Sequence, residues 1–289
     1  MTRIDALRTG ELPAEERGVV HEHLKTCSTC DESLSDVAEL ARAVKSLAVA
    51  PPRSCRSAVT NECADRTDTV VVGSRVIRVA FSDRGLRMIH LGSTADEFRS
   101  LHAQRFARDL VEGELPAKLR RQVESAISGE GVDKPSVDLD DVTEFERSVL
   151  EILTRIPKGE VRSYAWVARQ AGRPNAVRAV GNICARNVVP FVVPCHRVVP
   201  TSGGIGSYAF GSPEKRELLK KEGVAIDELD ALAKKRIRFV GSKNTSIFCF
   251  PTCRDARRIR EENKVAFHNA GDAEKKGFRP CLRCQPAAA

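Results

Sequence analysis

Two adjacent side chains, Cys195 and His196, place a nucleophile next to a base. A thiol reacts as its thiolate, and an imidazole can take the thiol proton near neutral pH. The pair lies in the apolar run 191–199, which is entered through Pro194 and predicts a β-strand. The alternative is a buried strand cysteine that merely precedes a histidine, so the surrounding residues must decide between the two.

Four further cysteines have the spacing of metal ligands. Cys249 and Cys253 form a Cys-x3-Cys pair, and Cys281 and Cys284 form a Cys-x2-Cys pair 27 residues further on. Four thiolates in two such pairs are what a tetrahedral zinc site requires. Two disulfides are the alternative, which the absence of a signal-peptide core disfavours. We therefore expect Zn²⁺ here and no organic cofactor.

A helix-turn-helix pattern precedes the Cys-His pair. Residues 163–171 favour a helix, Gly172-Arg173-Pro174 breaks it, and Asn175 is a good cap for a second helix to about residue 185. The second helix has small side chains with one arginine among them, namely Ala176, Arg178, Ala179 and Gly181. This pattern lets a backbone approach a nucleic-acid groove closely. Two helices of an ordinary bundle are the alternative.

Positive charge is concentrated in one segment. The chain has 47 Lys and Arg and 39 Asp and Glu, a formal net charge of +8, whereas residues 234–286 alone hold 14 basic and 5 acidic side chains. A segment that carries the whole excess is typical of a phosphate-binding module. A solvated charged surface is the alternative, and the four cysteines in the same segment argue against it.

Several motifs together resemble the O6-alkylguanine-DNA alkyltransferase family in order and spacing. They are Tyr164, Arg178-Ala179-Val180-Gly181, Asn187, Pro190, Pro194-Cys195-His196-Arg197-Val198, the loop 202–208, Lys215 and Lys221-Glu222-Gly223. The likeness covers about residues 145–224, and residues 69–137 lie where the family has a smaller α/β subdomain. The residue after the hinge asparagine, often proline in the family, is Val188 here.

The resemblance implies a single-use transferase, a methylated-DNA–[protein]-cysteine S-methyltransferase. The alkyl group of O6-alkylguanine would pass to Cys195, and O4-alkylthymine is a second candidate substrate. His196 would act as the base through a water, and Glu222 would orient the imidazole, as in a catalytic triad. Asn187 matches the family's hinge asparagine, and Tyr164 matches the tyrosine that crowds the target phosphate.

The resemblance also implies that the damaged base is flipped out of duplex DNA. Arg178 would fill the gap that the flipped nucleotide leaves, Pro190 would pack on the base, and the carbonyl of Val198 would hold it. The full set of residues to which it assigns DNA or base contacts is Arg178, Ala179, Gly181, Pro190, Val198, Ser207, Tyr208 and Ala209.

The basic C-terminal segment resembles the zinc-binding methyl-acceptor domain of Ada-type proteins. The likeness covers about residues 238–286 and is carried by Phe239-Val240-Gly241-Ser242, the two cysteine pairs and Gly277-Phe278-Arg279-Pro280. It implies that Cys249 accepts a methyl group from a methylphosphotriester of the DNA backbone. Phe250 stands where an arginine is usual, which weakens the expected phosphate contacts. A purely structural role for Cys249 is the alternative.

The N-terminal segment resembles the small zinc-binding anti-sigma domain over about residues 6–45. His23, Cys27 and Cys30 have the His-x3-Cys-x2-Cys spacing of three zinc ligands and give a second candidate metal site. The fourth ligand is not evident, because His21 is badly placed and Cys55 or Cys63 would require the linker to fold back. The resemblance implies a sigma factor as a partner, and a plain helical hairpin is the alternative.

These motifs predict a multidomain α/β protein. We expect an anti-sigma-like helical zinc-finger segment over residues 1–50, a linker over 51–67, a small α/β alkyltransferase subdomain over 68–140, a winged helix-turn-helix-like active-site domain over 141–228, and a small α+β zinc domain over 234–289.

The most direct functional reading is repair of alkylated double-stranded DNA by a monomer in a reducing cytoplasm. Ten cysteines, of which at least one must stay a free thiol, indicate that compartment. No apolar run is long enough to span a membrane, so no membrane partner is expected. The alternative is a regulatory protein that senses alkylation and acts on a sigma factor or another transcription partner.

Overall fold

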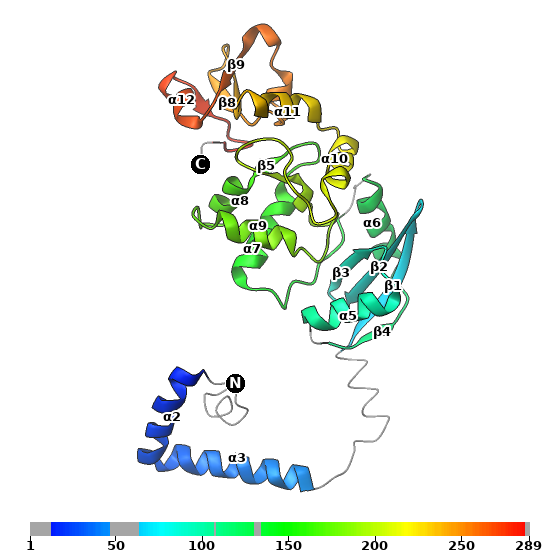
Figure 1. The fold of residues 1–289 in the computed structure, drawn as a ribbon, viewed down its shortest axis with the longest axis vertical. Coiled ribbons are helices and arrows are strands. Elements are labelled where there is room, and N and C mark those ends of the chain that lie inside the picture. The colour runs from blue at the N-terminus through cyan, green and yellow to red at the C-terminus, as the bar shows by residue number, and fades with distance from the viewer. Residues whose placement is uncertain (1–12, 47–63, 107, 130–133, 287–289) are drawn as a thin grey trace. The chain divides into compact units, whose positions relative to one another are not determined.

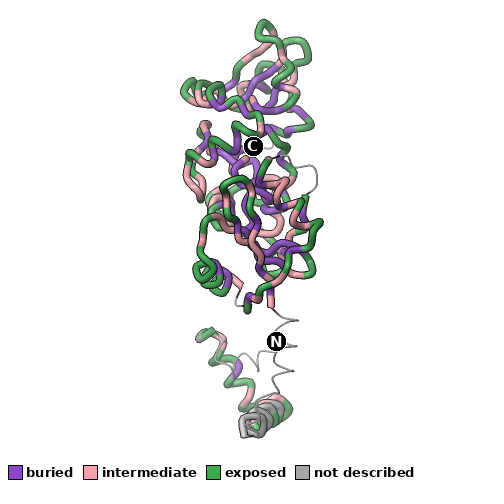
Figure 2. The backbone as a smooth tube through the Cα atoms, turned by 90° about the vertical axis from the view of Figure 1, so that its right-hand side faces the viewer, coloured by how far each residue is buried: buried purple, intermediate pink, exposed green. Residues whose placement is uncertain are grey.

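The computed structural model describes residues 13–46, 64–106, 108–129 and 134–286. The chain divides between residues 59 and 60 into two compact units. The described residues of the first unit form two helices, α2 (Ala14–Thr26) and α3 (Ser28–Ser46), with Cys27 between them (Figure 1). Among the side chains of this unit whose burial is described, Val20 is buried and the others are exposed or half-buried (Figure 2). The described part of this unit therefore has almost no core.

The second unit begins with a four-stranded sheet in the order β3-β2-β1-β4. Its first three strands form antiparallel pairs, and β4 runs parallel to β1. The elements are β1 (Asp65–Val72), β2 (Arg75–Ser82), β3 (Gly85–Leu91), α5 (Ala95–Phe106), β4 (Leu110–Glu112) and α6 (Ala117–Ser128). Buried Val70, Ile77 and Val79 belong to the same hydrophobic cluster as the helices that follow, so sheet and helices share a core.

A helical region follows the sheet in the chain and contains the Cys-His pair. Its elements are α7 (Glu144–Arg155), β5 (Arg162–Ser163), α8 (Tyr164–Gln170), α9 (Val177–Ala185), the 3-10 turn η1 (Cys195–Arg197), β6 (Val198–Val199), α10 (Ser212–Lys221) and α11 (Ile226–Lys234). Ser163 caps α8, because its side chain accepts a hydrogen bond from the Trp166 N–H. The short strands β5 and β6 pair in parallel.

Two local predictions are wrong. Asn175 does not cap the second helix, which begins at Val177 after Ala176 and has no side-chain cap. The run 191–199 is not a strand, because only Val198 and Val199 pair with β5. Pro194 lacks the N–H that a strand needs, and Phe191 adopts a left-handed φ of 69°, so the chain turns where its apolar composition favours extension.

The C-terminal part of the second unit is a small sheet with short helical turns. Its strand order is β10-β8-β7-β9. The elements are β7 (Phe239–Ser242), β8 (Ile247–Cys249), the 3-10 turns η2 (Ala256–Arg258) and η3 (Glu261–Asn263), β9 (Lys264–Phe267), α12 (Ala270–Lys275) and β10 (Arg279–Pro280). One small core contains Phe239, Phe248 and Phe267, and another contains the four cysteines. In the described residues, none of the helices has the length and apolarity that crossing a membrane requires.

Candidate active site and zinc centre

Cys195 is held at the start of η1 by Asn187. The thiol is 4% exposed. The Asn187 Nδ2 lies 3.1 Å from its Sγ and 2.9 Å from the Val193 carbonyl oxygen, to which it donates, while Asn187 Oδ1 accepts from the Val189 N–H at 3.1 Å. One amide therefore fixes the segment that follows α9 and the turn that presents the sulfur. This is the position that the sequence predicts for a hinge residue.

Burial raises the pKa of the Cys195 thiol, although the Asn187 hydrogen bond and the positive charge of Lys215 act in the opposite direction. The resting sulfur is therefore protonated at neutral pH. Lys215 itself is fully buried, and burial lowers its pKa to about 8. Its Nζ donates to the Val198 carbonyl at 2.6 Å and to the Ser207 carbonyl at 3.2 Å.

His196 is paired with Glu222 in a buried network. The His196 Nε2 lies 3.0 Å from Glu222 Oε1, and the Arg197 guanidinium donates to both carboxylate oxygens, at 2.9 and 2.7 Å. Burial opposes ionisation of Glu222, but its bonds to His196 and Arg197 lower its pKa to about 2. Burial lowers the pKa of His196 despite the carboxylate, so the imidazole is neutral and able to accept a proton.

The second ring nitrogen of His196 is not used within the described protein. The Nδ1 is buried and has no hydrogen-bond partner among the described residues. Because a buried polar atom is normally satisfied, this nitrogen is the one that remains available to a water or a substrate. The ring is thus oriented by Glu222 on one side and free to exchange a proton on the other.

Aromatic side chains surround the thiol and the imidazole. The Tyr208 ring lies edge-on to His196 with centroids 6.3 Å apart and packs against Phe210 at 5.5 Å, which in turn stacks on Phe191 at 6.1 Å. Tyr164, the first residue of α8, is half-buried, and burial raises its pKa to about 12. Its phenol therefore stays neutral and can donate a hydrogen bond.

The outer side of α9 fits a nucleic-acid surface. Val180, Ile183 and Cys184 are buried against the core, whereas Arg178 and Ala179 are exposed and Gly181 is half-buried. A helix with one exposed guanidinium among small residues can approach a groove closely. The predicted DNA-facing residues of α9 therefore lie on its accessible side.

The structure brings four of the five predicted catalytic residues together, and the fifth, Tyr164, lies at the start of α8. Asn187, Cys195, His196 and Glu222 form one connected group, and the predicted base contacts Val198 and Ser207 meet at Lys215. Pro190 is buried, whereas Ser207 and Ala209 are exposed. Sequence reasoning assigned no role to Lys215 or Arg197, although both lie within the quoted motifs. The burial of Lys215 could have been predicted, because it lies three and four positions before Leu218 and Leu219 and therefore on the same buried side of α10.

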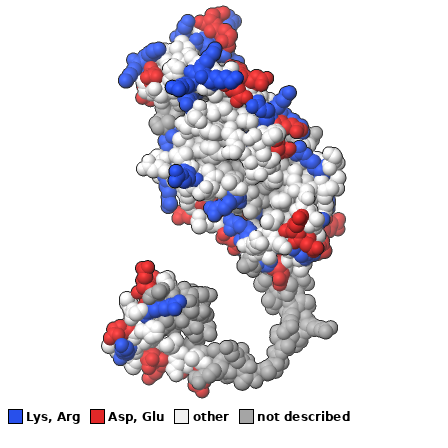
Figure 3. All heavy atoms as spheres, viewed as in Figure 1, with Lys and Arg blue, Asp and Glu red and all other residues white. Residues whose placement is uncertain are grey.

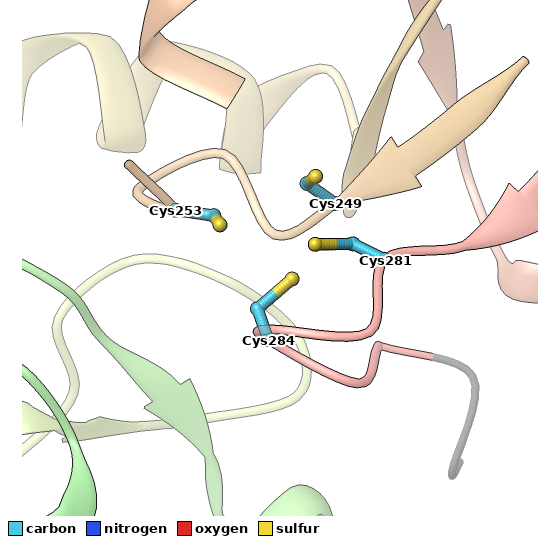
Figure 4. A group of neighbouring side chains, drawn as sticks. All are labelled: Cys249, Cys253, Cys281 and Cys284. Atoms are coloured by element: carbon cyan, nitrogen blue, oxygen red, sulfur yellow. The ribbon is translucent and has the colours of Figure 1, made fainter. Parts of the chain in front are cut away.

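Four cysteines converge in the C-terminal part. Their Sγ atoms all lie within 4.8 Å of one another, and every one of the four residues is buried. Figure 4 shows Cys249 at the end of β8, Cys253 in the following loop, and Cys281 and Cys284 after β10, with their sulfurs directed into a common space. A tetrahedral ion with Zn–S bonds of about 2.3 Å places its sulfurs about 3.8 Å apart, so the arrangement fits Zn²⁺.

A basic groove lies beside the first of these cysteines. It has a volume of about 630 Å³ and is lined by Cys249 and Cys281 together with the exposed arginines Arg258, Arg260, Arg279 and Arg283. On the visible face in Figure 3, Lys and Arg side chains gather over this C-terminal part. A thiolate next to several guanidiniums is suited to a reaction on a phosphate ester.

Phe250 does not face this groove. Its ring packs on Phe239 with centroids 5.4 Å apart, and the guanidinium of Arg162 lies 5.3 Å from its centre. The residue that stands in place of the usual arginine is thus used for packing against the alkyltransferase-like part of the chain.

A second cluster occurs in the first unit. The ligand atoms of His23, Cys27 and Cys30 lie within 4.8 Å of one another, with His23 Nε2 3.4 Å from Cys30 Sγ. His21 is turned away, because its Nδ1 contacts the Arg17 carbonyl at 2.7 Å. No fourth histidine, cysteine or carboxylate of the described residues joins the group, and Cys55 and Cys63 lie outside them.

Comparisons with known protein families match two segments of the chain. Residues 144–224 match the family model described as "6-O-methylguanine DNA methyltransferase, DNA binding domain", and residues 225–287 match the one described as "Metal binding domain of Ada". The second match assigns Zn²⁺ as the cofactor of the four-cysteine site. The two matched segments are adjacent in the chain.

Individual relatives match parts of the chain. A methylated-DNA–protein-cysteine methyltransferase of Methanosarcina acetivorans is 42% identical over 103 residues, which are 36% of this chain and 66% of that protein. The regulatory protein ada of Salmonella typhimurium is 38% identical over 149 residues, 50% of this chain and 41% of that protein. The chain thus spans about two fifths to two thirds of the length of these relatives.

A crystal structure of Mycobacterium tuberculosis OGT in complex with DNA is 28% identical in sequence, with a TM-score of 0.45. The match covers 54% of this chain and 92% of that one.

Proposed function

Residues 144–224 belong to the family of 6-O-methylguanine DNA methyltransferase DNA-binding domains and residues 225–287 to the family of Ada metal-binding domains, and on this premise we propose that the chain repairs alkylated DNA by direct transfer to Cys195. The observation that carries the proposal is a buried thiol next in the chain to a buried imidazole that a carboxylate orients at 3.0 Å. The substrate is O6-alkylguanine, with O4-alkylthymine as a second substrate class.

The reaction needs no group beyond these residues and one water. His196 Nδ1 takes the Cys195 proton through the water, and Glu222 stabilises the resulting imidazolium. The thiolate attacks the alkyl carbon, so that an S–C bond forms while the C–O6 bond of the base breaks. The proton released from the thiol ends on the guanine, and the thioether that remains on Cys195 cannot leave at neutral pH. Each molecule therefore acts once.

Duplex DNA must deliver the base to this buried sulfur. The exposed side of α9 is placed to enter a groove, where Arg178 would occupy the space of the flipped nucleotide and Tyr164 would crowd its phosphate. The loop with Ser207, Tyr208 and Ala209 and the carbonyl of Val198 would hold the base. Lys215 supports both of these elements, because it donates to one carbonyl of each.

A matched pair of cysteine variants tests this proposal. Purified protein is incubated with duplex DNA that contains radiolabelled O6-methylguanine, and the labelled peptide is identified by mass. We expect label on Cys195, none in Cys195→Ser, and unchanged labelling in Cys184→Ser, which alters another buried thiol of the same region. Lesion that binds but keeps its methyl group would contradict an enzymatic role.

A second transfer, from a methylphosphotriester to Cys249, is supported by the basic groove beside that thiol. Cys249, Cys253, Cys281 and Cys284 would hold Zn²⁺, which would keep these thiolates deprotonated and nucleophilic. Cys249 would attack the methyl carbon, forming an S–C bond as the C–O bond of the ester breaks and a phosphodiester anion departs. The arginines along the groove would bind the flanking phosphates.

The test of this second transfer uses DNA that carries only methylphosphotriesters. We expect zinc-loaded protein to acquire the methyl group on Cys249 and the Arg279→Ala variant to react several-fold more slowly, whereas Lys275→Ala, an exposed position on α12, keeps the normal rate. Zinc-loaded protein that leaves such DNA unchanged would make Cys249 a structural ligand only.

The N-terminal helices favour a second candidate function. The gathered His23, Cys27 and Cys30 support a metal-stabilised helical pair of the anti-sigma type, and through it an alkylation-sensing role on a sigma factor. In this arrangement residues 1–50 would bind the partner, and the linker would be shorter than the expected 51–67, because β1 begins at Asp65. Residues 65–140 and 141–228 would form the two-part alkyltransferase, and residues 234–289 would form the zinc domain. We infer that the protein acts as a monomer.

A further inference from the structure

The zinc centre and the first helix of the helix-turn-helix are joined by direct hydrogen bonds. The indole Nε1 of Trp166 donates to the Cys284 carbonyl at 3.0 Å, and the Trp166 side chain is 8% exposed. One helical turn later, Gln170 Nε2 donates to Gln285 Oε1 at 2.9 Å. Two positions on the same side of α8 are thus bonded to the last zinc ligand and its neighbour.

The loop between the first two zinc ligands holds the segment that leads into α8. Thr252 Oγ1 accepts from the Val161 N–H at 2.9 Å, and the Arg254 N–H donates to Glu160 Oε1 at 3.0 Å. These bonds are local to the metal site, because Thr252 lies directly before Cys253. Both halves of the four-cysteine site therefore contact residues 160–170.

A buried ionic and aromatic group fills the space between these contacts. Glu160 and Arg162 form an ion pair, and both are 2% exposed. The Arg162 guanidinium lies 5.6 Å from the Trp166 ring centre and 5.3 Å from that of Phe250. Phe250, which follows the first zinc ligand, thus completes the packing of this interface.

The contacts depend on the conformation of two loops whose shape is fixed by their cysteines. Metal modules of this size fold with their ion and lose their structure without it. If the loops relax, the buried Trp166 N–H and Val161 N–H lose their acceptors, and a buried unsatisfied donor is strongly unfavourable. The hydrogen bonds that hold β5 and α8 against the zinc module are then lost.

We propose that the four-cysteine site, with Zn²⁺ bound, positions α8 and thereby Tyr164 for alkyl transfer to Cys195. The part that concerns transfer rests on the proposed function, whereas the positioning of α8 does not. Tyr164 begins a helix of seven residues, so a displacement at Trp166 or Gln170 reaches it within two turns. The zinc site and the alkyltransferase site are then structurally coupled. The zinc module supports transfer from the base to Cys195, in addition to its own reaction with the phosphate backbone.

The chain contains its own reporter for this coupling, because Trp166 is its single tryptophan. Zinc is removed from the full-length protein with a chelator under reducing conditions, and its loss is verified by metal analysis. We expect the tryptophan emission to shift to longer wavelengths, the amides of α8 to exchange hydrogen faster, and the rate of methyl transfer to Cys195 to fall about tenfold, as loss of buried hydrogen bonds implies. Added Zn²⁺ should restore all three.

Two variants assign the effect to the interface. Thr252→Val keeps the four thiols and should keep its zinc, yet it should show faster α8 exchange and slower transfer, whereas Thr154→Val on α7, the same chemical change away from the zinc module, should behave normally. Cys27→Ser alters only the N-terminal cluster, so it should respond to chelation as the unaltered protein does.

The outcomes separate this proposal from the repair function. Emission and α8 exchange that stay unchanged after verified zinc loss would overturn the positioning of α8. Both changing with zinc, in a protein that never transfers a methyl group, would support the positioning and contradict repair. A transfer rate that is the same with and without zinc, although α8 loosens, would overturn the link to Cys195.

Discussion

At the residue scale, the reactivity of Cys195 depends on charges that the chain places around a buried sulfur. Burial alone would keep the thiol protonated, and the nearby Lys215 charge is one of the groups that favour its thiolate. The same lysine is bonded to two carbonyls of the base-holding elements. Lys215 therefore combines an electrostatic task with a positioning one, and it does so from a helix that follows the thiol by about 20 residues.

The ionisation of Lys215 predicts a decline of activity at alkaline pH. Its pKa is lowered to about 8, so its positive charge is present below that pH and is lost as the pH rises through it. Single-turnover transfer from O6-methylguanine DNA, measured from pH 6 to 10, should therefore fall above about pH 8. In Lys215→Met the rate at pH 7 should be about tenfold lower and the alkaline decline absent, because the charge is missing throughout.

The control is Lys220→Met, which removes an exposed charge from the same helix and should keep the profile of the unaltered protein. An alkaline decline that persists in Lys215→Met would show that another group causes it.

At the element scale, the glycine-rich loop between β6 and α10 is a shaped part of the site. It carries Ser207 and Tyr208, and it can bend back over η1 because Gly203, Gly204 and Gly206 have positive φ angles. At Gly206 a side chain is also excluded by space, since a Cβ would lie 2.6 Å from Pro200 Cδ. The loop conformation thus depends on both backbone freedom and close packing.

Replacing Gly206 should therefore cost more than replacing a glycine of similar φ in open space. Gly206 has a φ of +69° and Gly172 has +71°, but a Cβ on Gly172 meets nothing within 4 Å. Left-handed strain alone is worth about 1–3 kcal/mol. In urea unfolding we expect Gly172→Ala to lose stability within that range and Gly206→Ala to lose more, with slower transfer in Gly206→Ala. Equal losses in the two variants would contradict the packing argument.

At the scale of the whole molecule, the two units differ in how they are stabilised. The second unit has extended hydrophobic clusters, whereas in the first, among the side chains whose burial is described, Val20 is buried and Val19 is 69% exposed. A helical pair whose described side chains form so little core would be stabilised by a bound metal, a partner or both. This is the physical basis for expecting a partner at the N-terminal unit.

The corresponding prediction concerns a purified sigma factor of the host. It should bind the full-length protein, and His23→Ala should abolish that binding because the three-ligand cluster is disrupted, while transfer to Cys195 remains normal. His21→Ala is the matched control, since His21 lies on the same helix and is turned away from the cluster. Binding that survives His23→Ala, measured by titration calorimetry, would separate the partner from the metal site.

The sequence by itself determined which groups can react and where one of the helices begins and ends. The Cys195-His196 pair, the four cysteines and the helix over residues 164–170 were accessible because spacing, propensity and capping by Ser163 are local properties. Local propensity also misled, since the valine-rich run 191–199 favours a strand and yet Pro194 and the left-handed Phe191 turn the chain. Asn175 also failed as a cap, because α9 begins only at Val177, after Ala176.

Only the tertiary structure decided which distant groups share a site. Lys215 reaches Cys195 from α10, and Arg197 meets Glu222 across 25 positions of the chain. Their charges and hydrogen bonds lower the pKa values of Cys195 and Glu222 against the effect of burial, and no local pattern encodes that balance. The contact between Trp166 and Cys284 joins residues 118 positions apart. Electrostatic and hydrogen-bond energies depend on distance and solvent exclusion in the folded chain, so the coupling of the zinc centre to α8 became visible only there.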